Sequence, residues 1–195
     1  MRKLIVANVV TLDGYYEGPG SNVMAMPMDL FFDAYNAERL RSADTLLLGR
    51  RTYDMFRGFW PSVADDPACS PVHREISRRD DEVEKIVVSD TITMADTAPW
   101  TDTTRILRRP DAHEQIADLK RGDGGDILVF GSRTLWNDLV TAGLVDELHL
   151  MVGPLVLGEG TLAFAGGKVP PFRLLDTRTV DGSDNVLIRY NAQPA

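Results

Sequence analysis

Apolar residues follow two different spacings along this chain, and the spacing predicts where strands and helices lie. Residues 3–12 (KLIVANVVTL) form an almost unbroken apolar run rich in β-branched residues, which is typical of a buried strand. The run ends at Asp13-Gly14, a turn signal that opens a loop over residues 13–22. From Pro27 to Ala43 apolar residues recur at helical spacing, and proline suits the first position of a helix.

The next segments predict a short strand, a short helix and a polar connection. Thr45 to Leu48 is a brief apolar run that predicts a buried strand, and Thr52 to Phe59 predicts a short helix. Residues 60–84 are rich in polar residues and proline, which predicts loops around one polar helix.

A second series of strands and helices follows. The predicted strands are residues 85–89, 104–108, 126–131 and 146–152, and the predicted helices are residues 110–122 and 132–143. Residues 172–191 predict a hairpin with Asp181-Gly182 at its turn. Because strands alternate with helices, we expect an α/β fold: a mainly parallel central sheet with helices on both faces and a C-terminal antiparallel hairpin. No linker interrupts the pattern, so we expect residues 1–195 to form a single domain.

Composition and charge narrow the classes of function. The 195 residues are 44% hydrophobic and 26% charged, and the net charge of −8 argues against general affinity for nucleic acid or anionic membranes. The apolar run at the N-terminus is too short for a signal-peptide core or a membrane span, which favours a cytoplasmic protein. Cys69 is the only cysteine and the histidines share no ligand spacing, so we expect no disulfide and no metal site.

Two strand-to-helix junctions carry the candidate chemistry. In each, a glycine ends a predicted strand, and arginine and hydroxyl residues open the next helix. The first junction consists of Gly49, Arg50, Arg51 and Thr52, and the second of Gly131, Ser132, Arg133 and Thr134. Free N–H groups at helix N-termini, guanidinium groups and hydroxyls all bind phosphate oxygens. Two such junctions favour a ligand with more than one phosphate, although glycine, serine and threonine also occur there for structural reasons alone.

The order of these motifs resembles the dihydrofolate reductase-like superfamily, particularly the branch related to the reductase domain of the bifunctional riboflavin-biosynthesis deaminase/reductase. The resemblance rests on KLIVANVVTLDG, PMDLFF, LLLGRRTYDMF, KIVVSDT, ILVFGSRTLWNDL and VDELHLMVGPLVLGEGTLAF, which together run over nearly the whole chain. It implies that both junctions hold the phosphates of NADPH, with Arg50 or Arg51 selecting the 2′-phosphate. It also implies that Ser89 lies by the adenosine ribose, that the nicotinamide lies beside residues 8–16, and that the chain forms a homodimer.

Two carboxylates are candidates for the catalytic side of the site. Asp29 stands in a Pro-x-Asp-Leu sequence, which resembles the motif whose carboxylate holds the pterin amino group in dihydrofolate reductases. Such a carboxylate can accept two hydrogen bonds from an aminopyrimidine and favour protonation of the ring. At the third position of its predicted helix, Asp29 could equally complement the helix dipole. Asp13, in the sequence TLDG, could orient a substrate or only shape the turn.

The residues and the resemblance together predict an NADPH-dependent reductase. We expect it to transfer hydride to a small pterin-like or pyrimidine-like heterocycle, in riboflavin- or folate-type metabolism, as a 5-amino-6-(5-phosphoribosylamino)uracil reductase-like enzyme. The alternative is a non-catalytic NADP-binding protein of the same fold, in which the dinucleotide site is kept and the substrate carboxylate is lost.

Overall fold

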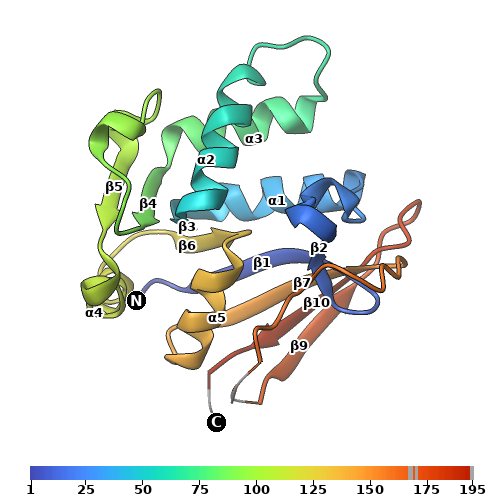
Figure 1. Cartoon of the computed structure of the whole chain (residues 1–195). Coiled ribbons are helices and arrows are strands. Elements are labelled where there is room, and N and C mark those ends of the chain that lie inside the picture. The colour runs from blue at the N-terminus through green and yellow to red at the C-terminus, as the bar shows by residue number, and fades with distance from the viewer. Residues whose placement is uncertain (167–168, 170, 194–195) are drawn as a thin grey trace.

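A central sheet of eight strands organises the molecule, as the computed structural model of residues 1–166, 169 and 171–193 shows (Figure 1). The strand order across the sheet is β5-β4-β3-β6-β1-β7-β10-β9. The strands are β1 Leu4–Thr11, β3 Ala43–Gly49, β4 Glu84–Val88, β5 Thr104–Leu107, β6 Asp126–Phe130, β7 Glu147–Gly153, β9 Arg173–Arg178 and β10 Val186–Asn191. The first six run parallel, while β10 pairs antiparallel with both β7 and β9. This confirms the predicted mainly parallel sheet with a C-terminal antiparallel hairpin.

Helices cover both faces of this sheet (Figure 1). The helices are α1 Leu30–Ser42, α2 Arg50–Phe59, α3 Pro71–Glu82, α4 Arg109–Arg121 and α5 Arg133–Thr141. On one face α1, α2 and α3 close a core with residues such as Ile5 and Leu46, and on the other α4 and α5 close a core with Leu4 and Leu47. Successive strand residues point to opposite faces, so one apolar run supplies both cores.

The first helix begins later than its apolar spacing predicts. The helix α1 starts at Leu30, and Asp29 is its N-cap with extended backbone, not its third residue. Pro27 is held outside the helix because its carbonyl accepts a 2.8 Å hydrogen bond from Asn185 Nδ2. Its ring also packs against Gly153, where an added Cβ would lie 2.2 Å from Pro27 Cγ. Contacts made by distant residues therefore override the local preference of proline for a helix start.

A second, smaller sheet replaces part of the predicted loop over residues 13–22. Strand β2, Tyr15–Glu17, pairs antiparallel with β8, Thr161–Leu162. A strand this short has no sequence signal of its own, because its partner lies far away in the chain. The predicted polar helix within residues 60–84 is confirmed as α3, and α2 begins at Arg50, two residues before its predicted start. Within the described ranges, no helix combines the length and apolar character needed to cross a membrane.

Candidate functional site

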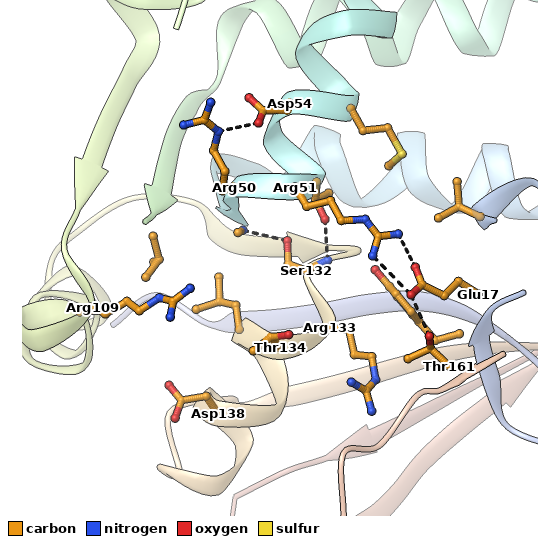
Figure 2. Close-up of a pocket in the computed structure, with 18 of the residues that line it drawn as sticks. Glu17, Arg50, Arg51, Asp54, Arg109, Ser132, Arg133, Thr134, Asp138 and Thr161 are labelled. Atoms are coloured by element: carbon orange, nitrogen blue, oxygen red, sulfur yellow. Dashed lines mark hydrogen bonds and ion pairs between the residues drawn. The ribbon is translucent and has the colours of Figure 1, made fainter. Parts of the chain in front are cut away.

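The two glycine junctions lie side by side at the carboxyl ends of β3 and β6, which are neighbours in the sheet. The N–H of Gly49 donates to Ser132 Oγ at 3.0 Å, and the N–H of Ser132 donates to Thr52 Oγ1 at 2.8 Å (Figure 2). These hydroxyls therefore join one junction to the other. The N-termini of α2 and α5 are brought together, and their positive dipole ends add at one place.

A cavity of about 940 Å³ opens between these two helix ends, within the range of ligand sites in proteins. It extends from the end of β4 and the start of α4, past both junctions, to β2 and β8. Its lining comprises Tyr16, Glu17, Val23, Gly49, Arg50, Arg51, Thr52, Asp54, Met55, Val88, Arg109, Ala112, His113, Ser132, Arg133, Thr134, Leu135, Asp138 and Thr161. Arg109 and Arg50 mark one end and Glu17 and Thr161 the other (Figure 2).

Gly131 makes room for the close approach of the two junctions. Its φ is +54°, a left-handed conformation that side chains with a Cβ rarely adopt. A Cβ at this position would also lie 2.8 Å and 2.9 Å from the side-chain atoms of Thr52. The next residue, Ser132, shares the left-handed conformation and is the N-cap of α5. The backbone thus turns sharply between strand and helix, which leaves the helix end open to the cavity.

The arginines of the cavity differ in how their charge is balanced. Arg50 forms an ion pair with Asp54 at 2.5 Å, within one turn of α2. Arg133 instead donates to backbone carbonyls, those of Leu162 and Phe164. Among the described residues Arg133 has no carboxylate partner, so its charge is available to an anion.

Two cavity residues that the sequence did not single out are Arg109 and Glu17. Arg109 opens α4, is largely exposed, and lies 3.5 Å from Asp90. Glu17 is 3% exposed, and its carboxylate accepts hydrogen bonds from Arg51 and from Thr161 Oγ1. An arginine next to proline at a predicted helix start was the available signal for Arg109. For Glu17 no local signal exists, because its surroundings come from β8 and α2.

Tyr16 lies in the same lining, with its side chain partly buried. Burial raises the pKa of its phenol to about 12, with the neighbouring Glu17 carboxylate acting in the same direction. The phenol is therefore a neutral hydroxyl at physiological pH. An added Cβ on Gly131 would lie 3.2 Å from the Tyr16 oxygen, so this hydroxyl reaches the junction itself.

The structure places Asp29 outside the lining of this cavity. One carboxylate oxygen accepts the N–H of Phe32 at 2.9 Å, as expected of an N-cap, and the other accepts the hydroxyl of Ser183 at 2.5 Å. Burial opposes ionisation of Asp29, but the hydrogen bonds from Ser183 and Phe32 outweigh it and lower its pKa. Asp29 therefore fastens the start of α1 to the turn of the C-terminal hairpin.

Asp13 and Ser89 also have structural partners. Asp13 accepts the hydroxyl of Thr11 at 2.6 Å and the N–H groups of Leu157 and Gly158, and the bond from Thr11 is the main cause of its lowered pKa. It thereby fixes the loop that leads into β8. Ser89 is buried after β4, where its Oγ accepts N–H groups of the following turn, while its neighbour Val88 lines the cavity.

Comparison with known proteins assigns the family. The model of the RibD C-terminal domain matches residues 2–187 of this chain. The chain belongs to the RibD C-terminal domain family. The uncharacterized protein YyaP of Bacillus subtilis (strain 168) is 31% identical over 181 residues, which cover 91% of this chain and 89% of YyaP.

Solved structures share the fold of this RibD C-terminal domain. A protein ascribed to riboflavin biosynthesis from Shewanella sp. PV-4 superposes with a TM-score of 0.68 at 21% identity, covering 97% of this chain and 98% of that one. A deaminase/5-amino-6-(5-phosphoribosylamino)uracil reductase of Thermotoga maritima gives 0.67 at 12% identity, covering 97% and 56%. Dihydrofolate reductase of Enterococcus faecalis gives 0.59 at 15% identity, covering 97% and 95%. The dihydrofolate reductase-like fold expected from the sequence is thereby confirmed.

Proposed function

We propose that this chain is an NADPH-dependent reductase that transfers hydride to a C=N or C=O bond of a small pyrimidine-like or pterin-like heterocycle. The observation that carries the proposal is the cavity between the N-termini of α2 and α5, with Arg50, Arg109 and Arg133 in its lining. Membership in the RibD C-terminal domain family favours an oxidoreductase. The Thermotoga maritima neighbour is named a reductase of a pyrimidine-like compound, and the Enterococcus faecalis neighbour was solved with NADP(H).

The residues present suit a phosphorylated dinucleotide. Gly49 lines the cavity without a side chain, which leaves its backbone open to a pyrophosphate, and Gly131 lets the second junction lie close against Thr52. Arg133 would supply a guanidinium that no described carboxylate neutralises. Val88, Ala112 and Leu135 offer apolar lining beside Arg50 and Arg109, a combination that suits a purine ring with a phosphate next to it.

NADPH, when bound, supplies the hydride, and the chain supplies binding and orientation. The helix ends and Arg133 would hold the phosphates in place. Tyr16 would present a neutral hydroxyl near the second junction, since its pKa of about 12 keeps it protonated. The catalytic roles of Asp29 and Asp13, the homodimer and the cytoplasmic location stay predictions.

A titration with both reduced cofactors tests the proposal. We expect NADPH to bind at least about tenfold more tightly than NADH, because one charge-assisted contact to the 2′-phosphate is worth about 1.4 kcal/mol or more. Isothermal titration calorimetry measures both affinities, and NADPH oxidation with pterin and pyrimidinone candidates measures turnover. Equal affinities for the two cofactors would contradict the assignment of an arginine to the 2′-phosphate.

A non-catalytic NADP-binding protein is the second candidate, and one observation favours it. The carboxylates of Asp29 and Asp13 both have structural partners, and neither residue lines the cavity. This candidate predicts tight NADPH binding with no oxidation by any pterin or pyrimidinone. Turnover of any such compound at a rate above the spontaneous one would exclude it.

A further inference from the structure

We propose that Glu17 sets the ligand selectivity of one end of the cavity by neutralising Arg51. Arg51 is then unavailable to a phosphate group, and phosphate binding is left to Arg133. The inference rests on the proposed function, because it takes the cavity to be a dinucleotide site. It goes beyond that function by assigning a role to a residue that no motif marks.

The ion pair between Glu17 and Arg51 is bidentate. The guanidinium nitrogens of Arg51 donate to the two carboxylate oxygens of Glu17, at 2.5 Å and 3.3 Å (Figure 2). Planar pairing of this kind fixes the direction of the guanidinium as well as its position. Arg51 also donates to the carbonyl of Ser21 at 3.2 Å. Two of these bonds attach Arg51 to β2, and the third attaches it to the turn that follows β2.

The two partners differ in exposure. The side chain of Glu17 is 4% exposed, whereas that of Arg51 is 62% exposed. A buried carboxylate without a partner destabilises the folded state, so Glu17 depends strongly on its ion pair with the Arg51 guanidinium. Burial alone would raise the pKa of Glu17, but the hydrogen bonds from Arg51 and Thr161 lower it. Glu17 is therefore ionised at neutral pH and cancels the charge of Arg51.

Glu17 cannot readily move away to release its partner. Thr161 Oγ1 donates to its carboxylate at 2.9 Å, and β2 pairs with β8 through the same two residues. An added Cβ at Gly160 would lie only 2.3 Å from the Glu17 carbonyl oxygen, so the two backbones are in close contact. Asp13 holds the preceding part of that loop through Leu157 and Gly158. A ligand phosphate would have to displace a carboxylate that is already in place.

The charge balance therefore differs between Arg133 and Arg51. At the second junction Arg133 is bound only by carbonyl oxygens and has no carboxylate partner among the described residues. At the Glu17 end the nearest cation is already paired. Phosphate oxygens are favoured beside Arg133, and an uncharged group is favoured beside Arg51.

A double-mutant cycle with inorganic pyrophosphate as the probe tests this role. Glu17→Gln keeps the size of the side chain and removes its charge, so it should release Arg51 and raise pyrophosphate affinity about tenfold. Glu17→Gln combined with Arg51→Gln should lose that gain. Glu159→Gln removes a carboxylate from an exposed position of the neighbouring loop, outside the cavity lining, and should stay within about twofold of wild type. Calorimetry gives the affinities, and a thermal melt of each variant confirms folding.

An unchanged pyrophosphate affinity in folded Glu17→Gln, or a gain that survives the loss of Arg51, would overturn the inference. If Glu17→Gln does not fold, NMR of the wild-type guanidinium groups provides the test. Added pyrophosphate should shift the Arg133 side-chain signal and leave that of Arg51 in place, and a shift of the Arg51 signal would contradict the proposal. Because the probe needs neither cofactor nor turnover, these results are independent of whether NADPH oxidation is observed.

Discussion

Asp80 lies on α3 with its side chain completely buried, and neither carboxylate oxygen has a hydrogen-bond partner among the described residues. Burial raises the pKa of this carboxyl well above its ordinary value of 3.8, although the positive charge of Lys85 opposes the shift. The folded state then holds a proton that the unfolded state releases. The resulting stability is present below about pH 4 and is lost as the pH rises toward the folded-state pKa.

Replacing Asp80 with Asn should therefore stabilise the protein at alkaline pH. The amide has nearly the same shape and cannot ionise. The free-energy cost of burying a charged carboxylate, or of keeping it protonated at high pH, therefore disappears. We expect a gain of about 1 kcal/mol or more at pH 8, which corresponds to about 2–4 °C in melting temperature. The difference from wild type should shrink as the pH falls to 4. Thermal melts across this pH range measure it, and a constant difference would contradict the linkage.

The role of Asp29 can be tested by comparing a variant of Asp29 with a variant of Ser183, which donates a hydrogen bond to it. Asp29→Asn keeps an oxygen for the N–H of Phe32, since Asn is as good an N-cap as Asp, but removes the charge. Ser183→Ala removes the bond to the other oxygen and keeps the carboxylate. A catalytic Asp29 predicts that Asn lowers NADPH oxidation about a hundredfold while Ser183→Ala stays near wild type. If both variants change only the melting temperature, Asp29 is a helix cap alone.

At the scale of elements, the junction between β6 and α5 depends on Gly131. Valine at this position would force a branched side chain into a left-handed conformation and against Thr52. We expect Gly131→Val to abolish NADPH binding. Gly143→Val is the matched control, because Gly143 ends the same helix with φ of +70° and has nothing within 4 Å of an added Cβ. The control should lose stability but bind NADPH normally, as calorimetry on both variants will show.

Sequence periodicity predicted the elements that carry a regular apolar pattern of their own. The apolar runs of β1, β3 and β6 and the helices α2 and α5 follow from residue spacing, since a buried strand or an amphipathic helix leaves a regular pattern. It failed at the start of α1, where Pro27 is held by Asn185 and Gly153. It also missed β2, which pairs with the distant strand β8.

The residues of the candidate site also fall into those that the sequence made recognisable and those that it did not. Gly49 and Gly131 could be recognised because each junction is a continuous motif, and their juxtaposition followed from parallel neighbouring strands. The partners of Arg51 and Asp29 could not be predicted. Glu17 and Ser183 reach them through folds of the chain that leave no spacing pattern in the sequence.

At the scale of the whole molecule, cofactor binding should be visible as stability. A ligand that binds only the folded state at a hundred times its dissociation constant adds about 2.7 kcal/mol. For a chain of 195 residues this corresponds to a rise of roughly 5–10 °C in melting temperature. We expect NADPH to produce this shift in a thermal melt and NADH at the same concentration to produce a clearly smaller one. No shift with NADPH would contradict binding at the cavity.

The position of β1 in the sheet has a consequence for synthesis of the chain. All eight of its residues are buried, and its neighbours are β6 and β7, whose residues lie more than a hundred positions later, as in the pairs Leu4 with Ile127 and Ile5 with Glu147. During synthesis the apolar segment of β1 therefore leaves the ribosome long before β6 and β7 have been synthesised. Pairings this distant in sequence slow folding and expose intermediates to aggregation. A nascent chain truncated before β7 cannot complete the central sheet, so it should depend on chaperones until its C-terminal third has emerged.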